Sequence, residues 1–291
     1  MIIKNAIKNQ SYKINFNMDL KKYLNNLIKK YYKVAIITDE NVYKIYKEKI
    51  NIKGLDILRV KPGEKSKSFT VKNSLDEKLL EKKFNRNSLI IGFGGGVVGD
   101  LSGYVAATIL RGIDLVHIPT SLIAIVDSSI GGKTGINSKN GKNLIGSFYN
   151  PREILINSEF INTLSLKEIR QGLSEIIKYG VIKSEKIFNF LEKSNKVFMQ
   201  NHKKNIDKII KECIKIKIDT VEKDFKENDL RSILNFGHTI GHALEKKYSY
   251  KFSHGDCIGT GMAIESLIAN NIYKLSTRNF SRILKLLDRF E

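Results

Sequence analysis

In the first half of the chain, short runs of apolar residues alternate with longer segments whose apolar positions recur with helical period. The runs are "KVAIITDE", "GLDILRV", "NSLIIGFGGG" and "IDLVHIPTS", and the helical segments between them are 41–50, 69–84 and about 96–107. Short apolar runs that end at glycine, proline or acidic residues are typical of buried strands. Strands that alternate with helices predict a parallel sheet with helices on both faces.

The pattern changes after "FYNPREILIN". From Ser165 to Phe290 the segments are long and of helical period, and glycine or asparagine residues separate them. A chain of 291 residues is long enough for two domains that each bury a core. We therefore predict an α/β domain over residues 1–157 and an all-helical domain over residues 158–291.

The formal net charge is +20, but the lysines are spread along the chain and mixed with acidic residues. No basic strand interleaved with aromatic residues is present, so the charge predicts solvated helix faces and attraction of small anions, and no nucleic-acid partner. The apolar stretch 88–110 contains six glycines and, at its middle, Asp100. A carboxylate at the centre of a bilayer is costly, so we expect no membrane span.

The location of the protein is predicted from its termini and its cysteines. The N-terminal "MIIKNAIKNQSYKINF" lacks the continuous apolar core of a signal peptide. The two cysteines, Cys213 and Cys257, are too few for a disulfide framework. Both observations favour a reducing cytoplasm.

A glycine turn follows the third predicted strand. In "IIGFGGGVVGD", Gly94, Gly96 and Gly99 match G-x-G-x-x-G, a pattern that lets backbone N–H groups approach a pyrophosphate. The acidic residue expected about twenty positions later is missing, and a tight turn packed on a neighbouring element explains the glycines equally well. Asp100 lies just inside the next helix and suits a phosphate poorly. This predicts a nucleotide that lies differently from that of the usual dinucleotide fold.

A polar segment lies further along the chain. "IPTSLIAIVDSSIGGKTGIN", followed by "GKNLIGSF", places Asp127, Lys133, Lys142 and Asn143 around glycine turns. Lysines beside flexible backbone donors suit a phosphate or a carboxylate. Ordinary surface loops also collect these residue types, so the interest of this segment depends on its nearness to the glycine turn.

The stretch "LNFGHTIGHALEKKYSYKFSHGD" holds three of the five histidines. His238 and His242 stand one helical turn apart, and His254 begins the next segment. Two or three histidines with one carboxylate would bind a divalent metal, with zinc as the first candidate. Glu175, on the otherwise apolar turn "GLSEIIKYG", could supply the carboxylate. Alternatively, it forms an ordinary surface pair with Lys178.

The ordered motifs, spread from about residue 62 to 261, resemble those of the 3-dehydroquinate synthase family. They are "GEKSKS", "GFGGGVVGDLSGYVAATILRGI", "IPTSLIAIVDSSIGGKTGIN", "GKNLIGSFYNP", "GLSEIIKYG" and "RSILNFGHTIGHALE…HGD". The resemblance implies a dehydroquinate synthase-like fold, a homodimer, and NAD together with Zn²⁺ or Co²⁺. The implied enzyme is a lyase of the shikimate pathway. It cyclises 3-deoxy-D-arabino-heptulosonate 7-phosphate to 3-dehydroquinate and eliminates phosphate.

The resemblance also assigns roles to individual residues. It implies that the metal ligands are Glu175, His238 and His254. It implies that the NAD-binding residues are Asp39, Glu64, Lys67, Gly95, Gly96, Val97, Val98, Asp100, Thr120, Ser121, Asp127, Lys133, Lys142, Asn143, Phe160 and Thr163. The implied catalytic residues are Asp127, Lys133, Lys178, Glu227, Arg231, Asn235 and His242. The implied substrate-binding residues are Arg111, across the dimer interface, with Lys133, Asn143, Lys178, Lys217, Arg231, Asn235 and His242.

Two departures from the family and three alternatives remain. Family members usually continue through further C-terminal helices, one of which supplies a basic residue to the substrate, and we expect this sequence to lack that residue. They also commonly carry Glu where Asp256 stands. The alternatives are another sugar-phosphate cyclase, a polyol dehydrogenase of the same fold, which has Asp in place of Glu175, and an inactive nucleic-acid-binding or structural homologue.

Overall fold

The computed structural model describes residues 1–3, 11–194, 203–249 and 251–290. The chain divides into two compact units, Met1–Thr163 and Leu164–Glu291. We describe each unit by itself. No helix among the described residues is long and apolar enough to span a bilayer.

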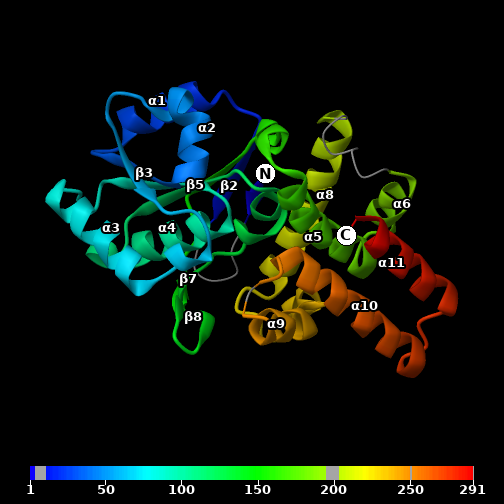
Figure 1. Cartoon of the computed structure of the whole chain (residues 1–291). Helices are drawn as coiled ribbons and strands as arrows, with labels where there is room; N and C mark the ends of the chain where they lie inside the picture. Colours follow the sequence, from blue (N-terminus) through cyan, green and yellow to red (C-terminus); the bar gives the residue numbers. More distant parts are fainter. Residues whose placement is uncertain (4–10, 195–202, 250, 291) are drawn as a thin grey trace. The chain divides into compact units, whose positions relative to one another are not determined.

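The first unit is built on a seven-stranded sheet of order β1-β2-β9-β6-β5-β3-β4 (Figure 1). Its strands are β1 (Ile2–Ile3), β2 (Tyr12–Phe16), β3 (Val34–Asp39), β4 (Leu55–Val60), β5 (Leu89–Gly94), β6 (Asp114–Pro119) and β9 (Glu153–Ile156). All neighbours pair in parallel except β1 and β2. The predicted parallel sheet is confirmed, and β1, β2 and β9 extend it beyond the strands that the pattern predicted.

Helices cover both faces of this sheet, as predicted. They are α1 (Leu20–Lys30), α2 (Glu40–Ile50), α3 (Phe69–Glu81) and α4 (Gly96–Thr108). Along β3, Val34 and Ile36 pack with apolar residues of α1 and α2, whereas Ala35 and Ile37 pack with those of α3 and α4. Because both faces are covered, the strand reads as a continuous apolar run rather than an alternating one.

The first unit continues through the 3₁₀ helix η4 (Ser158–Thr163). The ring of Phe160 packs edge-to-face on Tyr46 and Phe93, with centroids 5.1 and 5.7 Å away, and is fully buried. The hydroxyls of Tyr46 and Thr163 are hydrogen-bonded at 2.7 Å. These contacts place the end of the unit at Thr163, whereas the sequence pattern placed the boundary after residue 157.

The polar segment after β6 is more regular than the loops that its composition suggested. It forms a π-helical turn, η3 (Ala124–Ser128), and a hairpin of β7 (Lys133–Ser138) and β8 (Gly141–Phe148). Gly135 and Gly146 face each other across the hairpin. A Cβ at Gly146 would lie only 2.1 Å from the Thr134 carbonyl oxygen, so the two strands approach backbone to backbone there.

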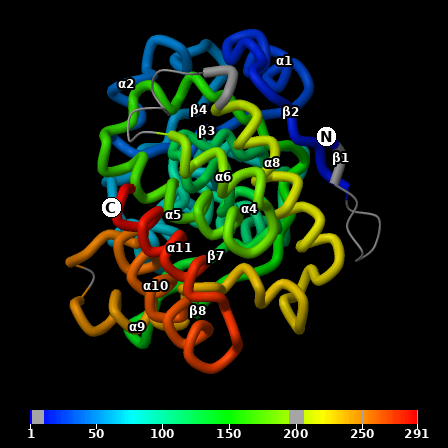
Figure 2. Tube along the Cα trace, turned by 90° about the vertical axis from the view of Figure 1, so that its right-hand side faces the viewer, coloured from blue at the N-terminus to red at the C-terminus, as the bar shows by residue number. Residues whose placement is uncertain are grey.

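The second unit is helical among its described residues, which confirms the predicted fold class. Its elements are α5 (Leu166–Ile182), α6 (Glu185–Lys193), α8 (Lys203–Lys223), η5 (Leu230–Asn235), α9 (His238–Lys247), α10 (His254–Ile272) and α11 (Thr277–Phe290). α5 contacts α6, α8, α10 and α11, and α9 packs on α10 (Figure 2). α5 buries most of its residues from Ile169 to Gly180, as expected for a helix at the centre of a unit.

His117 on β6 makes the first unit sensitive to acid. Burial lowers the pKa of its imidazole to about 4, from an ordinary 6.5, and the side chain is 5% exposed. Between pH 6.5 and 4 the unfolded chain binds a proton that the folded chain does not. Stability is therefore lost as the pH falls through this window, by about 3 kcal/mol for a shift of this size.

We expect His117 to lower the free energy of unfolding, measured in urea, by about 3 kcal/mol between pH 7 and pH 4, in addition to the effect of the other titrating groups. The His117→Gln variant should be less stable at pH 7 but should lack this share of the pH dependence. Equal pH dependence in both proteins would show that His117 is already protonated in the fold.

Candidate functional site

The glycine turn lies at the carboxyl edge of the sheet, where parallel α/β sheets bind ligands. β5 runs into Gly95, the N-cap of α4, and no side chain caps this helix end. A Cβ at Gly95 would lie 3.2 Å from Ser121 Oγ, and one at Gly96 would lie 3.1 Å from Ser128 Oγ, so both positions are closely covered. The uncapped N–H groups of a thirteen-residue helix favour an anion at this turn.

Lys67 brings four of the predicted cofactor residues together. Its ammonium donates to Asp100 Oδ2 at 2.6 Å and to Asn143 Oδ1, and lies 3.7 Å from Glu64 Oε1. The Lys67 side chain is almost fully buried. Burial raises the pKa of Asp100, and the charge of Lys67 opposes that rise. Asp100, whose negative charge suits a phosphate poorly, is therefore paired with the positive charge of Lys67.

Other predicted cofactor residues serve the local structure as well. Asp39, at the end of β3, caps α2, since its Oδ1 accepts from the N–H groups of Asn41 and Val42. The N–H of Thr120 donates to the Gly94 carbonyl at 2.9 Å, which joins the ends of β6 and β5. The side chains of Val98 and Phe160 are buried and pack in the core of the unit.

The remaining predicted residues of the first unit lie on or near its surface. Asp127 on η3 and Lys142 on β8 are half-buried, whereas Lys133 on β7 is exposed. Arg111 is exposed at the end of the 3₁₀ turn η2 (Ile109–Arg111), where Leu110 and Arg111 have φ angles of 52° and 66°. Two consecutive non-glycine residues in this sparsely populated conformation fix the direction of the Arg111 backbone at an energetic cost.

In the second unit, three helices bring the predicted metal ligands to one point. Glu175 comes from α5, His238 begins α9 and His254 begins α10. Glu175 Oε1 lies 3.5 Å from His238 Nε2 and 3.6 Å from His254 Nε2. One donor atom from each residue lies within 4.8 Å of the others. Two imidazoles and one carboxylate are a donor set that zinc and cobalt accept in catalytic sites.

The environment of Glu175 fits a bound cation. Its side chain is 1% exposed, and among the described residues its oxygens face the Lys178 ammonium and the two imidazoles but make no hydrogen bond of regular geometry. It pairs with Lys178, which is equally buried, so the expected Glu–Lys pair forms but does not lie on the surface. Burial alone would raise the pKa of Glu175, but Lys178 and the two histidines hold it well below its usual range. Glu175 is therefore an ionised carboxylate that could bind a metal.

Glycines hold the three helices at this short distance. A Cβ at Gly255 on α10 would lie 2.6 Å from the Gln171 Cα on α5, and one at Gly261 would lie 2.0 Å from the Gly237 carbonyl oxygen before α9. The helices therefore cross with their backbones almost in contact. Ser253 and Asp256 form a capping box that fixes the first turn of α10, and so Asp256 serves well where the family commonly has Glu.

The other predicted residues of the second unit lie on α5, α8, η5, α9 and the segment before η5. The His242 ring is exposed and its centroid lies 5.3 Å from that of His238. Asn235 donates to Glu227 Oε1 at 2.8 Å, and the buried Arg231 donates to the Phe225 carbonyl at 2.6 Å. Lys178 and Lys217 are buried as well.

Comparison of the sequence with models of known protein families shows to which family the chain belongs. The model of the 3-dehydroquinate synthase N-terminal region matches residues 57–171, and that of the C-terminal region matches residues 172–291. The chain belongs to the 3-dehydroquinate synthase family. This confirms the family predicted from the motifs.

Individual relatives agree with this result. The 3-dehydroquinate synthase of Dictyoglomus thermophilum is 45% identical over 97% of this chain and 79% of its own length. That of Caldanaerobacter subterraneus subsp. tengcongensis is 42% identical over 97% of this chain and 82% of its own. The structure of a 2-deoxy-scyllo-inosose synthase with carbaglucose-6-phosphate, NAD⁺ and Co²⁺ superposes with a TM-score of 0.88. It is 26% identical and covers 99% of this chain and 82% of its own. The relatives named 3-dehydroquinate synthase confirm the predicted enzyme class.

In this member of the 3-dehydroquinate synthase family, sequence reasoning missed two residues of the site. Asn137 donates to Glu64 Oε1 at 2.8 Å and accepts from the Asn143 N–H at 3.0 Å, which ties β7 to the Lys67 cluster. Glu245 lies beside His254 and is buried. Its position three residues after His242, on one face of a helix, is the signal that could have identified it.

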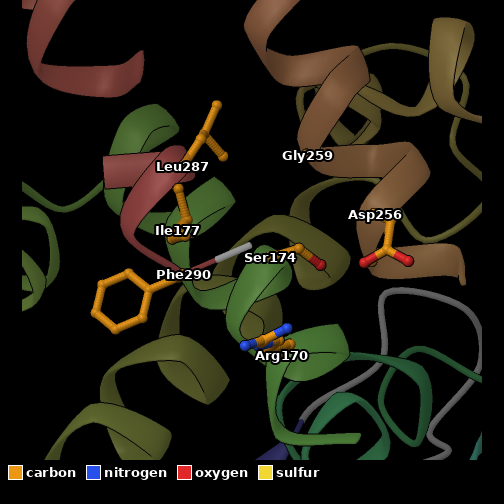
Figure 3. A pocket seen from close by; sticks show the side chains of 8 residues that line it. Arg170, Ser174, Ile177, Asp256, Gly259, Leu287 and Phe290 are labelled. Atoms are coloured by element: carbon orange, nitrogen blue, oxygen red, sulfur yellow. The ribbon is translucent and has the colours of Figure 1, made fainter. Parts of the chain in front are cut away.

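A small pocket lies between α5, α10 and α11. Arg170, Ser174 and Ile177 of α5 line it together with residues of α10 and α11 (Figure 3). It has room for about one water molecule. Ser174 precedes Glu175 and Gly255 follows His254 in the chain. The pocket therefore lies where α5 and α10, which carry these two proposed ligands, pack together.

Proposed function

We propose that this chain cyclises 3-deoxy-D-arabino-heptulosonate 7-phosphate to 3-dehydroquinate and phosphate, with NAD and a divalent metal, Zn²⁺ or Co²⁺, as cofactors. One observation carries the proposal: two histidines and a buried, ionised carboxylate converge from three helices, with one donor atom of each within 4.8 Å of the others. The glycine turn beside the Lys67 cluster is the proposed NAD site. This reaction eliminates phosphate without net oxidation, so it belongs to the lyases.

The choice of substrate rests on sequence similarity. The two 3-dehydroquinate synthases are 45% and 42% identical to this chain, whereas the cyclase that acts on a different sugar is 26% identical. Glu175 also stands where the polyol dehydrogenases of this fold would have Asp. Both observations favour the heptulosonate phosphate over the alternatives.

Different residues of the chain would bind the metal, the NAD and the substrate. Glu175, His238 and His254 would hold the metal, and Lys67, Asp100 and the glycine turn would hold NAD. When bound, NAD accepts and returns a hydride, and the metal acts as a Lewis acid. The substrate carries a phosphate and a carboxylate, and basic side chains such as those of Arg111, Lys133, Lys178, Lys217 and Arg231 would bind these groups.

His242 would move protons beside the metal site. Its ring is exposed and lies next to His238 but would not bind the metal, so the imidazole is placed to act as a general acid or base. We expect His242→Asn to lower kcat by about 100-fold, as for the loss of a general acid–base group, and to leave Co²⁺ binding intact. Steady-state kinetics and Co²⁺ titration would measure the two effects. A variant with full kcat would exclude this role.

The proposed function is tested by release of inorganic phosphate from the heptulosonate 7-phosphate in the presence of NAD⁺ and Co²⁺ or Zn²⁺. We expect release that a chelator abolishes, with formation of 3-dehydroquinate and no accumulation of NADH. Accumulation of NADH would instead identify a dehydrogenase. Absence of any turnover, together with salt-sensitive retention on DNA, would support the nucleic-acid-binding alternative.

We also propose that the chain works as a cytoplasmic homodimer. Both cysteines are buried and neither forms a disulfide, as is usual in a reducing compartment. The exposed, conformationally fixed Arg111 could reach a second chain. Light scattering on the purified protein measures the mass in solution, and a concentration-independent monomer would refute the dimer.

A further inference from the structure

Glu245 lies on the side of His254 that faces away from Glu175. Its carboxylate is 4% exposed, and its Oε1 lies 3.4 Å from His254 Nδ1. The other ring nitrogen of His254, Nε2, lies 3.6 Å from Glu175 Oε1. The imidazole is therefore held between two buried carboxylates that contact its two different nitrogens.

The second histidine has the same arrangement with a different acceptor. His238 Nδ1 lies 3.2 Å from the Phe236 carbonyl oxygen, and its Nε2 lies 3.5 Å from Glu175 Oε1. In both rings Nδ1 faces an acceptor and Nε2 faces the proposed metal position. An acceptor at one ring nitrogen holds the proton there and leaves the other nitrogen as the metal ligand.

We propose that Glu245 is a positioning residue for the metal centre: it orients His254 through Nδ1, and its charge strengthens Nε2 as a ligand. The proposal rests on the metal site described under Proposed function. Burial of a carboxylate is costly without a compensating interaction. Glu245 is buried although the next two residues along α9, Lys246 and Lys247, are exposed. The contact with His254 Nδ1 at 3.4 Å is an interaction that offsets part of the cost of that burial.

The same residues suggest one competing arrangement. His242, Glu245 and His254 could offer three donor atoms within 4.8 Å of one another, which would suit a second ion. In the structure, however, His254 Nδ1 already faces Glu245 within hydrogen-bonding range, and His242 is exposed. The geometry therefore favours one ion, and the number of ions bound per chain distinguishes the two arrangements.

The test is Co²⁺ binding by the full chain after removal of metal with a chelator, followed by visible absorption. The variants are Glu245→Ala, which removes the acceptor, and Glu245→Gln, which keeps an acceptor without the charge. The control is Glu192→Gln, whose carboxylate pairs with Arg282 on α11 and not with a histidine. Wild type should bind one Co²⁺ per chain, and Glu245→Ala should bind it about 10- to 100-fold more weakly, with a changed absorption spectrum.

Glu245→Gln should keep the wild-type band shape, because the acceptor remains, and should bind Co²⁺ with an affinity between those of wild type and Glu245→Ala, because the charge is lost. The control should match wild type. Equal affinity and spectra for wild type and Glu245→Ala would overturn the role of Glu245 and leave the proposed function standing. Two ions per chain in wild type, one of which is lost in Glu245→Ala, would overturn it in favour of a second metal site. A wild-type chain that binds no Co²⁺ would refute the metal site itself, and this role with it.

Discussion

Replacement of Glu175 by Gln should abolish metal binding and turnover. The amide keeps the shape of the side chain but removes the only carboxylate among the three proposed ligands. Loss of metal-dependent stabilisation worth about 4 kcal/mol would lower the rate of phosphate release by about a thousand-fold. Phosphate release and Co²⁺ titration of the chelator-treated protein measure the two losses separately.

The same substitution should destabilise the metal-free protein. Lys178 is 1% exposed and would lose the carboxylate with which it pairs. Removal of one partner of a buried ion pair costs about 3–5 kcal/mol, because the remaining charge stays out of water. Urea unfolding in the presence of chelator would measure this loss.

A double variant separates the two roles of Glu175. Glu175→Gln combined with Lys178→Met removes the buried ammonium as well, so the stability of the metal-free protein should largely return. Metal binding should not return, because the ligand is still missing. If the double variant bound Co²⁺ as wild type does, Glu175 would be a structural partner of Lys178 and not a ligand.

The strands at the centre of the sheet could be predicted because burial on both faces leaves a simple signal. Each of β3 and β5 is a run of apolar and small residues, and a helical segment follows it. β2 gives a weaker signal, since "YKINF" has exposed and half-buried positions among its buried ones. The β7–β8 hairpin could not be recognised from apolar residues, because β8 is largely exposed and glycines face each other at Gly135 and Gly146.

A metal site could be predicted from the sequence because only a few residue types, mainly histidine, cysteine and the acidic residues, bind zinc or cobalt. Histidine is rare in this chain, so the cluster of His238, His242 and His254 indicates a metal site, and apolar neighbours indicate Glu175. Only the resemblance to the family separates the two implied ligands from His242. Lys67 and Asp100 are 33 residues apart, and their contact depends on the order β5-β3-β4, which no local pattern contains. Glu245 precedes two lysines, so the sequence alone predicts a surface residue. Its burial depends on the packing of α10 against α9, which the local sequence does not indicate.

Gly261→Ala should destabilise the fold and disturb the metal site together. Gly261 lies where α9 and α10, the helices that carry His238 and His254, cross most closely. A Cβ at this position would lie 2.0 Å from the Gly237 carbonyl oxygen and 3.0 Å from the Gly241 nitrogen. Both are backbone atoms, so α9 and α10 would have to separate. We expect a loss of about 4 kcal/mol in the free energy of unfolding, beyond the usual cost of overpacking, because no side chain can move aside.

The separation should also weaken metal binding, because α9 carries His238 and α10 carries His254. We expect Co²⁺ to bind at least about 100-fold more weakly in the folded variant, since small displacements of ligands are costly in a site of fixed geometry. Gly99→Ala in α4 is the matched control: its Cβ would come no closer than 4.0 Å to the His117 ring. That change should leave Co²⁺ binding intact and cost no stability, since alanine favours a helix. If Gly261→Ala bound Co²⁺ as tightly as this control, the close crossing of α9 and α10 would not be what holds the two histidines in place.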